Sequence, residues 1–247
     1  WMSSADHDSL VTSHGAAQTD ATQVEKTLFF RKVEHLLKPN FCVLNIGANN
    51  GVENDPVYPL IRRFPHWRGI FVEPDPYNFR ALRENLRSFS NVTLVNAAIA
   101  ATSGKRKFFS VDERSGCDMR IVSQISSFSR EYVERVLQGL RDIPSIPDDT
   151  VTDDAEDYII EHSGIECLSI ADLLEETSVD HVDFLNIDTE GADFEIFSTI
   201  DFNKIRPAIL CIEVSAFSSE QLEIFSDAMK RYNYRFTMVF GTFSRVY

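Results

Sequence analysis

A short glycine turn between two apolar runs constrains the fold of this chain more than any other feature of its sequence. The run Phe41–Leu44 leads into Asn-Ile-Gly-Ala-Asn-Asn-Gly at 45–51, and a second apolar run at 69–72 ends at Glu73-Pro74. The order of strand, glycine turn, helix and second strand with a terminal acid is typical of the first βαβ unit of a nucleotide-binding α/β sheet. The acid can accept hydrogen bonds from both hydroxyls of a ribose. The sequence therefore predicts a nucleoside-containing ligand at this turn.

Helical and strand patterns continue to alternate after this unit, which predicts a doubly wound, mostly parallel α/β sheet. Further strands are expected at Val92–Val95, Lys107–Val111, Val182–Ile187 and Ala208–Val214, with helices between them. The last residues, around Gly241-Thr242, are expected to form a C-terminal antiparallel hairpin.

The composition of the chain divides it into a tail, a domain and an insertion. Residues 1–22 are polar and without periodicity, so they are expected to be a flexible tail, and residues 23–247 a single domain. The segment at about 113–164 interrupts the alternating pattern, and Asp142–Asp157 is rich in acids and carries two prolines. Two interpretations of this insertion have equal weight: a solvated linker, and a lid over the site.

The charge balance restricts the partners of the protein. With 38 acidic and 24 basic residues, the formal net charge is −14. This charge disfavours binding to a nucleic-acid backbone or to an anionic membrane surface. None of the four cysteines belongs to a CxxC pair and no signal peptide is visible, so a reducing, cytoplasmic compartment is expected. Nothing in the pattern indicates an oligomeric state.

The spacing of the glycines indicates which nucleoside cofactor fits. A dinucleotide fingerprint needs glycine at three positions that are occupied here by Gly47, Asn49 and Val52, so two of the three fail. A phosphate-binding loop of the GxxxxGK[ST] type is also absent. S-adenosylmethionine has a ribose and no phosphate, so the spacing of Gly47 and Gly51 suits it better.

Four sequence blocks resemble those of FkbM-type methyltransferases, which have the class I fold and use S-adenosylmethionine. They are the glycine turn at 44–51, Val-Glu-Pro-Asp-Pro-Tyr-Asn-Phe at 72–79, Val-Asn-Ala-Ala-Ile at 95–99 with Gly104 and Phe108, and Val-Asp-Phe-Leu-Asn-Ile-Asp-Thr-Glu-Gly-Ala-Asp at 182–193, followed by Pro207 and Ile212-Glu213. The resemblance implies a seven-stranded, Rossmann-like sheet and covers about residues 41–214. Asn45 and Asn186 depart from it, since many members have Asp and Lys there.

The residues and the resemblance together give a set of candidate site residues. Those expected to bind the cofactor are Asn45, Gly47, Ala48, Asn49, Gly51, Glu73, Pro74, Asn96, Ala97, Ser127 and Asp188. Asp188 and Glu190 follow a strand at the ligand-binding edge of the sheet and are the candidate catalytic residues. No residue is assigned as a metal ligand, although Mg²⁺ is a further candidate for this acidic pair.

The resemblance implies methyl transfer from S-adenosylmethionine to an oxygen, with a small molecule or a glycan hydroxyl as the acceptor. Two alternatives remain open at this point. One is a nicotinamide-dependent oxidoreductase on a related sheet. Val52, at the third glycine position of the dinucleotide fingerprint, disfavours it. The other is a non-catalytic binding module that has kept the fold, for which the changes at Asn45 and Asn186 leave room.

Overall fold

A computed structural model describes residues 31–247 apart from 32, 35, 37, 54, 116, 118–121, 123, 142–154, 237, 241–243 and 247. The polar tail expected at 1–22, most of the acidic stretch at 142–157 and the hairpin turn at 241–242 lie outside the described residues. Their predicted roles, including that of a lid, stay predictions.

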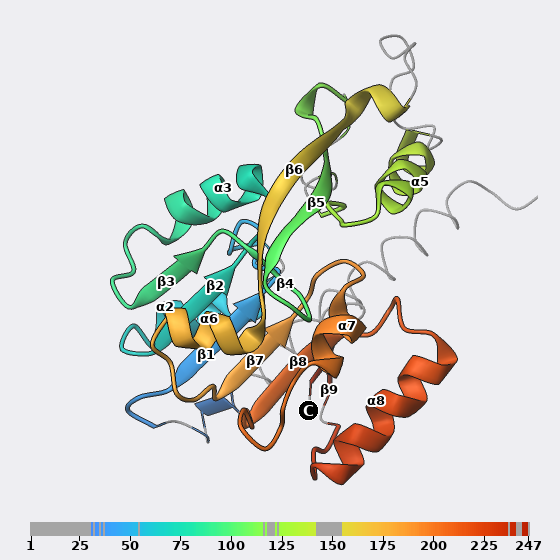
Figure 1. The fold of residues 1–247 in the computed structure, drawn as a ribbon. Coiled ribbons are helices and arrows are strands. Elements are labelled where there is room, and N and C mark those ends of the chain that lie inside the picture. The colour runs from blue at the N-terminus through green and yellow to red at the C-terminus, as the bar shows by residue number, and fades with distance from the viewer. Residues whose placement is uncertain are drawn as a thin grey trace, which may run out of the picture.

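A large sheet forms the centre of the molecule (Figure 1). Its strand order is β3-β2-β1-β7-β8-β10-β9, and the first five of these strands are parallel. The bounds are β1 Cys42–Ile46, β2 Arg68–Val72, β3 Val92–Val95, β7 Phe184–Ile187, β8 Ile209–Glu213, β9 Met238–Phe240 and β10 Ser244–Val246. The predicted α/β class with a mostly parallel central sheet is confirmed.

The prediction of one seven-stranded sheet is only partly met. Five strands form the parallel part, and β10 and β9 extend its edge as an antiparallel pair. The strand expected at Lys107–Val111 is not part of this sheet: it belongs to β5 (Gly104–Val111), in a separate three-stranded sheet of order β4-β6-β5. A short apolar strand pattern does not specify which partner strand it pairs with, so this second sheet was not predicted.

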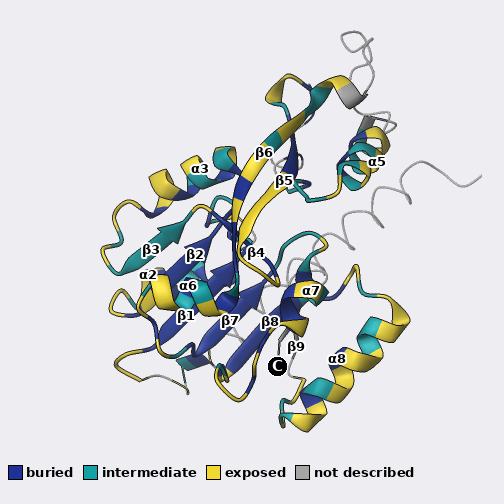
Figure 2. Ribbon diagram, in the orientation of Figure 1, coloured by how far each residue is buried: buried dark blue, intermediate teal, exposed yellow. Residues whose placement is uncertain are grey.

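Helices cover both faces of the central sheet, as a doubly wound fold requires. Helices α2 (Tyr58–Arg63) and α3 (Pro76–Leu86) pack on one face. Helices α6 (Ile170–Glu176), α7 (Asp193–Ser198) and α8 (Ser219–Arg231) pack on the other. Figure 2 shows that the central strands are buried between these two layers.

Alternation along each strand produces the two apolar layers. Val43 and Phe184 belong to the cluster under α2 and α3, whereas their chain neighbours Leu44 and Leu185 belong to the cluster under α6, α7 and α8. All four side chains are fully buried. The parallel strands are therefore apolar on both faces, which explains why they read as continuous apolar runs in the sequence.

Short polar residues fix where the helices begin. Asp75 caps α3 by accepting hydrogen bonds from the backbone N–H groups of Tyr77 and Asn78. The expected capping residue Ser169 accepts a hydrogen bond from the N–H of Asp172 at the start of α6. These caps hold the beginnings of helices beside strand ends, and α3 begins directly after Glu73-Pro74.

The second sheet projects from the central sheet as a long arm that carries α5 (Figure 1). It consists of β4 (Ala98–Ile99), β5 and β6 (Ile159–Leu168), and α5 spans Arg130–Arg141. Two 3₁₀ turns, Glu113–Ser115 and Ala155–Tyr158, lie near its tip. Regular structure therefore resumes earlier than the sequence indicated, because β6 begins within the segment expected to be an insertion.

Two observations bear on the environment of the protein. Cys42, Cys117, Cys167 and Cys211 are buried and free. Within the described part of the chain, no helix has both the length and the apolar character needed to cross a membrane.

Candidate functional site

A cavity of about 260 Å³ opens at the carboxyl ends of β1, β2 and β7 and extends under the arm. Nine residues predicted for the site from the sequence line it: Gly47, Ala48, Asn49, Glu73, Pro74, Ala97, Ser127, Asp188 and Glu190. The three other predicted residues, Asn45, Gly51 and Asn96, are not among its lining residues. The carboxyl edge of a parallel sheet is where ligands bind in folds of this type.

The turn after β1 brings backbone very close to backbone, and this is why it needs glycine. The N–H groups of Gly47 and Ala48 both donate hydrogen bonds to the carbonyl of Val72, each at 3.0 Å. Gly47 has φ +79°, and a Cβ atom there would lie 1.7 Å from the carbonyl oxygen of Asp188. The turn is thereby held between the ends of β2 and β7, the strands that carry Glu73 and Asp188.

Replacing Gly47 by Ala should destabilise the fold by more than about 2 kcal/mol, because strain at positive φ adds to a backbone collision. Urea unfolding measures this loss. The matched control is Gly139→Ala in α5, where a Cβ would meet nothing within 4 Å. That variant should keep or slightly raise the stability, as alanine favours a helix. Equal stability of the two variants would contradict the close approach at Gly47.

Glu73 is held in place by backbone donors on both sides of the cavity edge. Its Oε2 accepts a hydrogen bond from the N–H of Asn49 at 2.8 Å, and its Oε1 accepts one from the N–H of Asp75 at 2.9 Å. Burial raises the pKa of Glu73 to about 8. The Asn78 side chain also hydrogen-bonds this carboxyl group. A carboxylate has about four acceptor sites, so a ribose hydroxyl could still donate to it.

Asn96 and the Ser127 loop support this end of the cavity. The Asn96 amide donates hydrogen bonds to the carbonyl oxygens of Glu73 and Pro74, at 2.8 and 3.1 Å. Ser127 forms a two-way backbone bridge with Phe109 of β5. Ser126 donates a hydrogen bond from its hydroxyl to Asp75 at 2.9 Å. The loop is therefore tied to both the arm and the start of α3.

Asn45 and Gly51 act inside the fold. The Asn45 amide donates to Asp55 at 2.5 Å, and its oxygen accepts from the Asn186 amide at 2.8 Å. Asn45 and Asn186 are register partners on β1 and β7. The two positions that depart from the family pattern thus contact each other. A Cβ on Gly51 would lie 2.4 Å from Leu82 Cδ1, so this glycine lets α3 pack closely.

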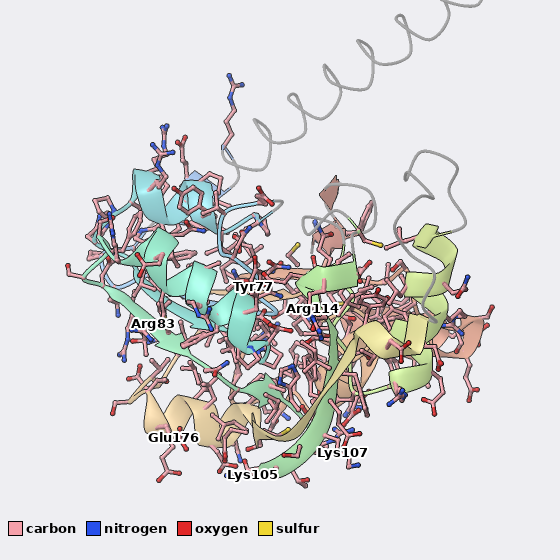
Figure 3. The ribbon with its side chains drawn as sticks, turned by 90° about the horizontal axis from the view of Figure 1, so that it is seen from above. Tyr77, Arg83, Lys105, Lys107, Arg114 and Glu176 are labelled. Carbon is pink, nitrogen blue, oxygen red and sulfur yellow. The ribbon has the colours of Figure 1, made fainter. Side chains whose placement is uncertain are left out.

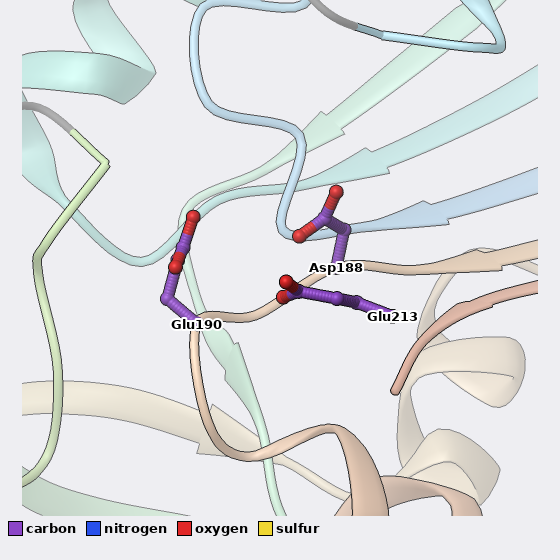
Figure 4. A group of neighbouring side chains, drawn as sticks. All are labelled: Asp188, Glu190 and Glu213. Carbon is purple, nitrogen blue, oxygen red and sulfur yellow. The ribbon is translucent and has the colours of Figure 1, made fainter. Parts of the chain in front are cut away.

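Three carboxyl groups gather at the other end of the cavity (Figure 4). Asp188 follows β7, Glu190 lies two residues later, and Glu213 ends β8. One oxygen from each lies within 4.8 Å of the others, a separation that a divalent cation could bridge. Glu190 has φ +54°, an uncommon value for a residue other than glycine. In Figure 4 its side chain stands apart from Asp188 and Glu213, whose carboxyl groups lie next to each other.

Burial and mutual repulsion dominate the electrostatics of these acids. Burial, followed by the charge of Glu213, raises the pKa of Asp188 to about 8. The same two causes raise the pKa of Glu190 to about 7. Burial also raises the pKa of Asp193, whose oxygens accept hydrogen bonds from the N–H groups of Thr189 and Gly191. Asp188 and Glu190 can therefore take up or release protons near neutral pH.

Several residues of this arrangement were not among the principal sequence candidates. Asp193 begins α7, and its only signal was its place in the sequence block at 182–193. Glu213 ends β8 and was a weaker sequence candidate of the same kind as Asp188 and Glu190, because the carboxyl ends of neighbouring parallel strands meet at one edge. Asp55 had none, since an acid inside a turn usually faces solvent. Arg106 and Phe128 also had none, because they belong to the arm, whose position over the cavity depends on the second sheet.

Comparisons with known proteins were made with this geometry in hand. The sequence model of the Methyltransferase FkbM domain matches residues 45–236. A search of curated proteins gave no significant match. Solved structures similar to this chain include a precorrin-6y C5,15-methyltransferase from Geobacter metallireducens GS-15, with 16% identity, TM-score 0.38, and coverage of 86% of this chain and 71% of the other. Another is a fibrillarin/Nop5p complex, with 11% identity, TM-score 0.37, and coverage of 85% and 72%.

Proposed function

Because this chain belongs to the FkbM methyltransferase family, we propose that it transfers a methyl group from S-adenosylmethionine to a hydroxyl oxygen of a small molecule or glycan. Membership in the family makes it a methyltransferase. The choice of oxygen as the acceptor atom and of the acceptor class are parts of the proposal.

The acidic lining of the cavity is the observation that best supports the proposal. Its described lining contains six acidic side chains, Glu53, Asp55, Glu73, Asp188, Glu190 and Glu195, and a single basic one, Arg106. Although burial keeps part of Glu73, Asp188 and Glu190 protonated near pH 7, this excess of acids gives the lining a net negative charge that would repel the pyrophosphate of a nicotinamide dinucleotide. It suits a nucleoside that carries positive charge and no phosphate. S-adenosylmethionine supplies a methyl group on a positively charged sulfur.

The residues divide between the two ends of that cofactor. We assign the ribose to Glu73, because this buried carboxylate is fixed by the N–H groups of Asn49 and Asp75. The adenine fits beside Ala97 and Ser127, at the end of β3 and on the adjoining loop. The amino-acid end carries an ammonium and a carboxylate, and it fits between the Gly47 turn and Asp188 with its ammonium toward Asp188.

Asp188 and Glu190 are then the groups that can receive the proton of the acceptor hydroxyl. Both line the cavity, and both have pKa values near neutrality. A general base is most effective when its pKa lies near the working pH. The remaining contribution of the protein is alignment of the acceptor oxygen with the methyl group in a partly dehydrated cleft.

Binding of S-adenosylmethionine should tighten as the pH rises from about 6 to 8. In the ligand-free protein, burial keeps part of Asp188 and Glu190 protonated in this range. A cation favours the ionised carboxylates, so binding releases protons. Calorimetry in two buffers with different ionisation enthalpies measures this release.

S-adenosylhomocysteine is the control ligand, because its uncharged sulfur should reduce the dependence on pH. NAD⁺ is titrated in the same way, and binding of NAD⁺ would support the oxidoreductase alternative. Methyl transfer to a panel of sugars and small hydroxylated molecules separates an enzyme from a non-catalytic module. An S-adenosylmethionine affinity that does not change between pH 6 and 8 would contradict the assigned role of the acids.

A further inference from the structure

The one basic side chain on the described cavity wall is held on an aromatic ring. Arg106 belongs to β5, and its guanidinium carbon lies 4.1 Å from the ring centroid of Phe128. Phe128 is fixed in turn, because it packs edge-on against Phe108 with ring centroids 5.3 Å apart, next to the buried cluster around Ala98 and Cys167. The guanidinium plane is therefore oriented before any ligand arrives.

The acidic partner of Arg106 within the protein is a weak one. The closest oxygen of Glu195, on α7, is 3.6 Å from Arg106 Nη1, beyond an ordinary hydrogen bond. The two side chains are 44% and 49% exposed, so solvent screens their attraction. Stacking on Phe128 occupies one face of the guanidinium and leaves its N–H edge able to form paired hydrogen bonds.

The rest of the cavity would direct an anionic group toward this residue. The acids at the Asp188 end repel negative charge, whereas Arg106 attracts it. A ligand with a carboxylate at one end and a cationic or hydroxyl group at the other would therefore be held in one direction.

We propose that Arg106, stacked on Phe128, is a carboxylate-binding residue of the cavity that fixes the orientation of the bound ligand. The carboxylate has two sources: the amino-acid part of S-adenosylmethionine, and a carboxylated acceptor such as a uronic acid. Both sources rest on the proposed function, the first on its cofactor and the second on its acceptor class.

The experiment compares two ligand pairs that differ in a carboxylate, by calorimetry on the full chain. The cofactor pair is S-adenosylhomocysteine and its decarboxylated analogue, 5′-(3-aminopropylthio)adenosine, which keeps the ammonium group and lacks only the carboxylate. The acceptor pair is glucuronate and glucose. Each is titrated into wild type, Arg106→Gln and Lys105→Gln. Lys105 is the matched control, because it lies one residue away on β5, outside the cavity lining, and extends from the rim of the arm (Figure 3).

In wild type, the carboxylated member of at least one pair should bind more tightly than its partner. Arg106→Gln should weaken that member about 10- to 100-fold and leave its partner within about twofold, as expected for a lost charge-assisted hydrogen bond. Lys105→Gln should leave both unchanged, and Glu195→Gln should strengthen binding of the carboxylate by removing a competitor. Which pair responds identifies the source.

The proposal is overturned if neither pair shows a carboxylate preference in wild type, or if Arg106→Gln retains the preference. The proposed function fails separately, if no adenosine ligand binds at all. Because the Arg106 contacts are exposed and weak, its replacement should not unfold the protein. A thermal melt of each variant checks this.

Discussion

Replacing Asp188 by Asn should lower methyl transfer by about 10²–10⁴-fold, the range for a lost general base. The substitution keeps the size and shape of the side chain and removes one of three gathered negative charges. Glu190→Gln makes the matching change at the second candidate, and at least one of the two variants should lose turnover. The measurement is transfer of a labelled methyl group to the acceptor found by panel screening, at saturating cofactor.

The same variants should stabilise the ligand-free protein at high pH. Burial raises the folded-state pKa values of Asp188 and Glu190 to about 8 and 7, from ordinary values of 3.8 and 4.5. Between those limits the folded state binds more protons than the unfolded chain, so stability falls as the pH rises through the folded pKa values. One pKa unit corresponds to about 1.4 kcal/mol. Asp188→Asn should therefore melt at least about 2–4 °C above wild type at pH 9, with a smaller difference at pH 5.

Whether the variants lose cofactor binding or turnover distinguishes the possible chemical roles of Asp188 and Glu190. A cofactor-binding role predicts weaker S-adenosylmethionine binding in the variant, whereas a general base predicts intact binding with slow turnover. If the acids hold Mg²⁺, a chelator should reproduce the variants, and added metal should restore chelated wild type. Asp227→Asn, an exposed acid in α8, is the control for the charge change. Full activity of both site variants, with and without chelator, would show that the acidic cluster is structural.

Sequence reasoning located the strands because parallel strands are buried on both faces and read as apolar runs. The runs ending at Asn45, Glu73 and Asp188 correspond to β1, β2 and β7, whose carboxyl ends surround the cavity. The helix cap predicted at Ser169 is also present in the structure. Apolar runs and helix caps both depend on residues that are close together in the chain, so they can be predicted from a single sequence.

Contacts between residues that are far apart in the chain could not be predicted from the sequence. The contact between Asn45 and Asn186 joins residues 141 positions apart, and it places in one hydrogen-bonded network the two departures from the family pattern. The network continues to Asp55, a half-buried acid inside a turn. The position of Arg106 depends likewise on β5 pairing with β6 rather than with the central sheet. Such contacts follow from the assembled fold and not from local periodicity.

Replacing Glu73 by Ala should weaken S-adenosylmethionine binding about 10- to 100-fold above pH 8, where Glu73 is ionised, since hydrogen bonds to a charged group contribute roughly 1.5–3 kcal/mol. Its carboxylate is buried and held by two backbone N–H groups, so it is oriented before the ligand binds. Titration calorimetry measures the affinity. Glu73→Gln, which keeps the shape, tests whether the charge itself is needed, and Glu84→Gln on the exposed side of α3 is the control for the loss of charge.

The ligand can be varied to show that the effect arises at the ribose. Wild type should bind S-adenosylhomocysteine more tightly than its 2′-deoxy analogue, because the analogue has one hydroxyl fewer to donate to Glu73. Glu73→Ala should bind both ligands about equally, since the acceptor of that hydrogen bond is gone, whereas Glu73→Gln keeps one amide oxygen that can accept it. A preference that persists in Glu73→Ala would place the ribose elsewhere in the cavity. If both variants bound both ligands as tightly as wild type, Glu73 would not belong to the cofactor site. Its role would then be structural, to connect the Asn49 turn to the start of α3 by hydrogen bonds.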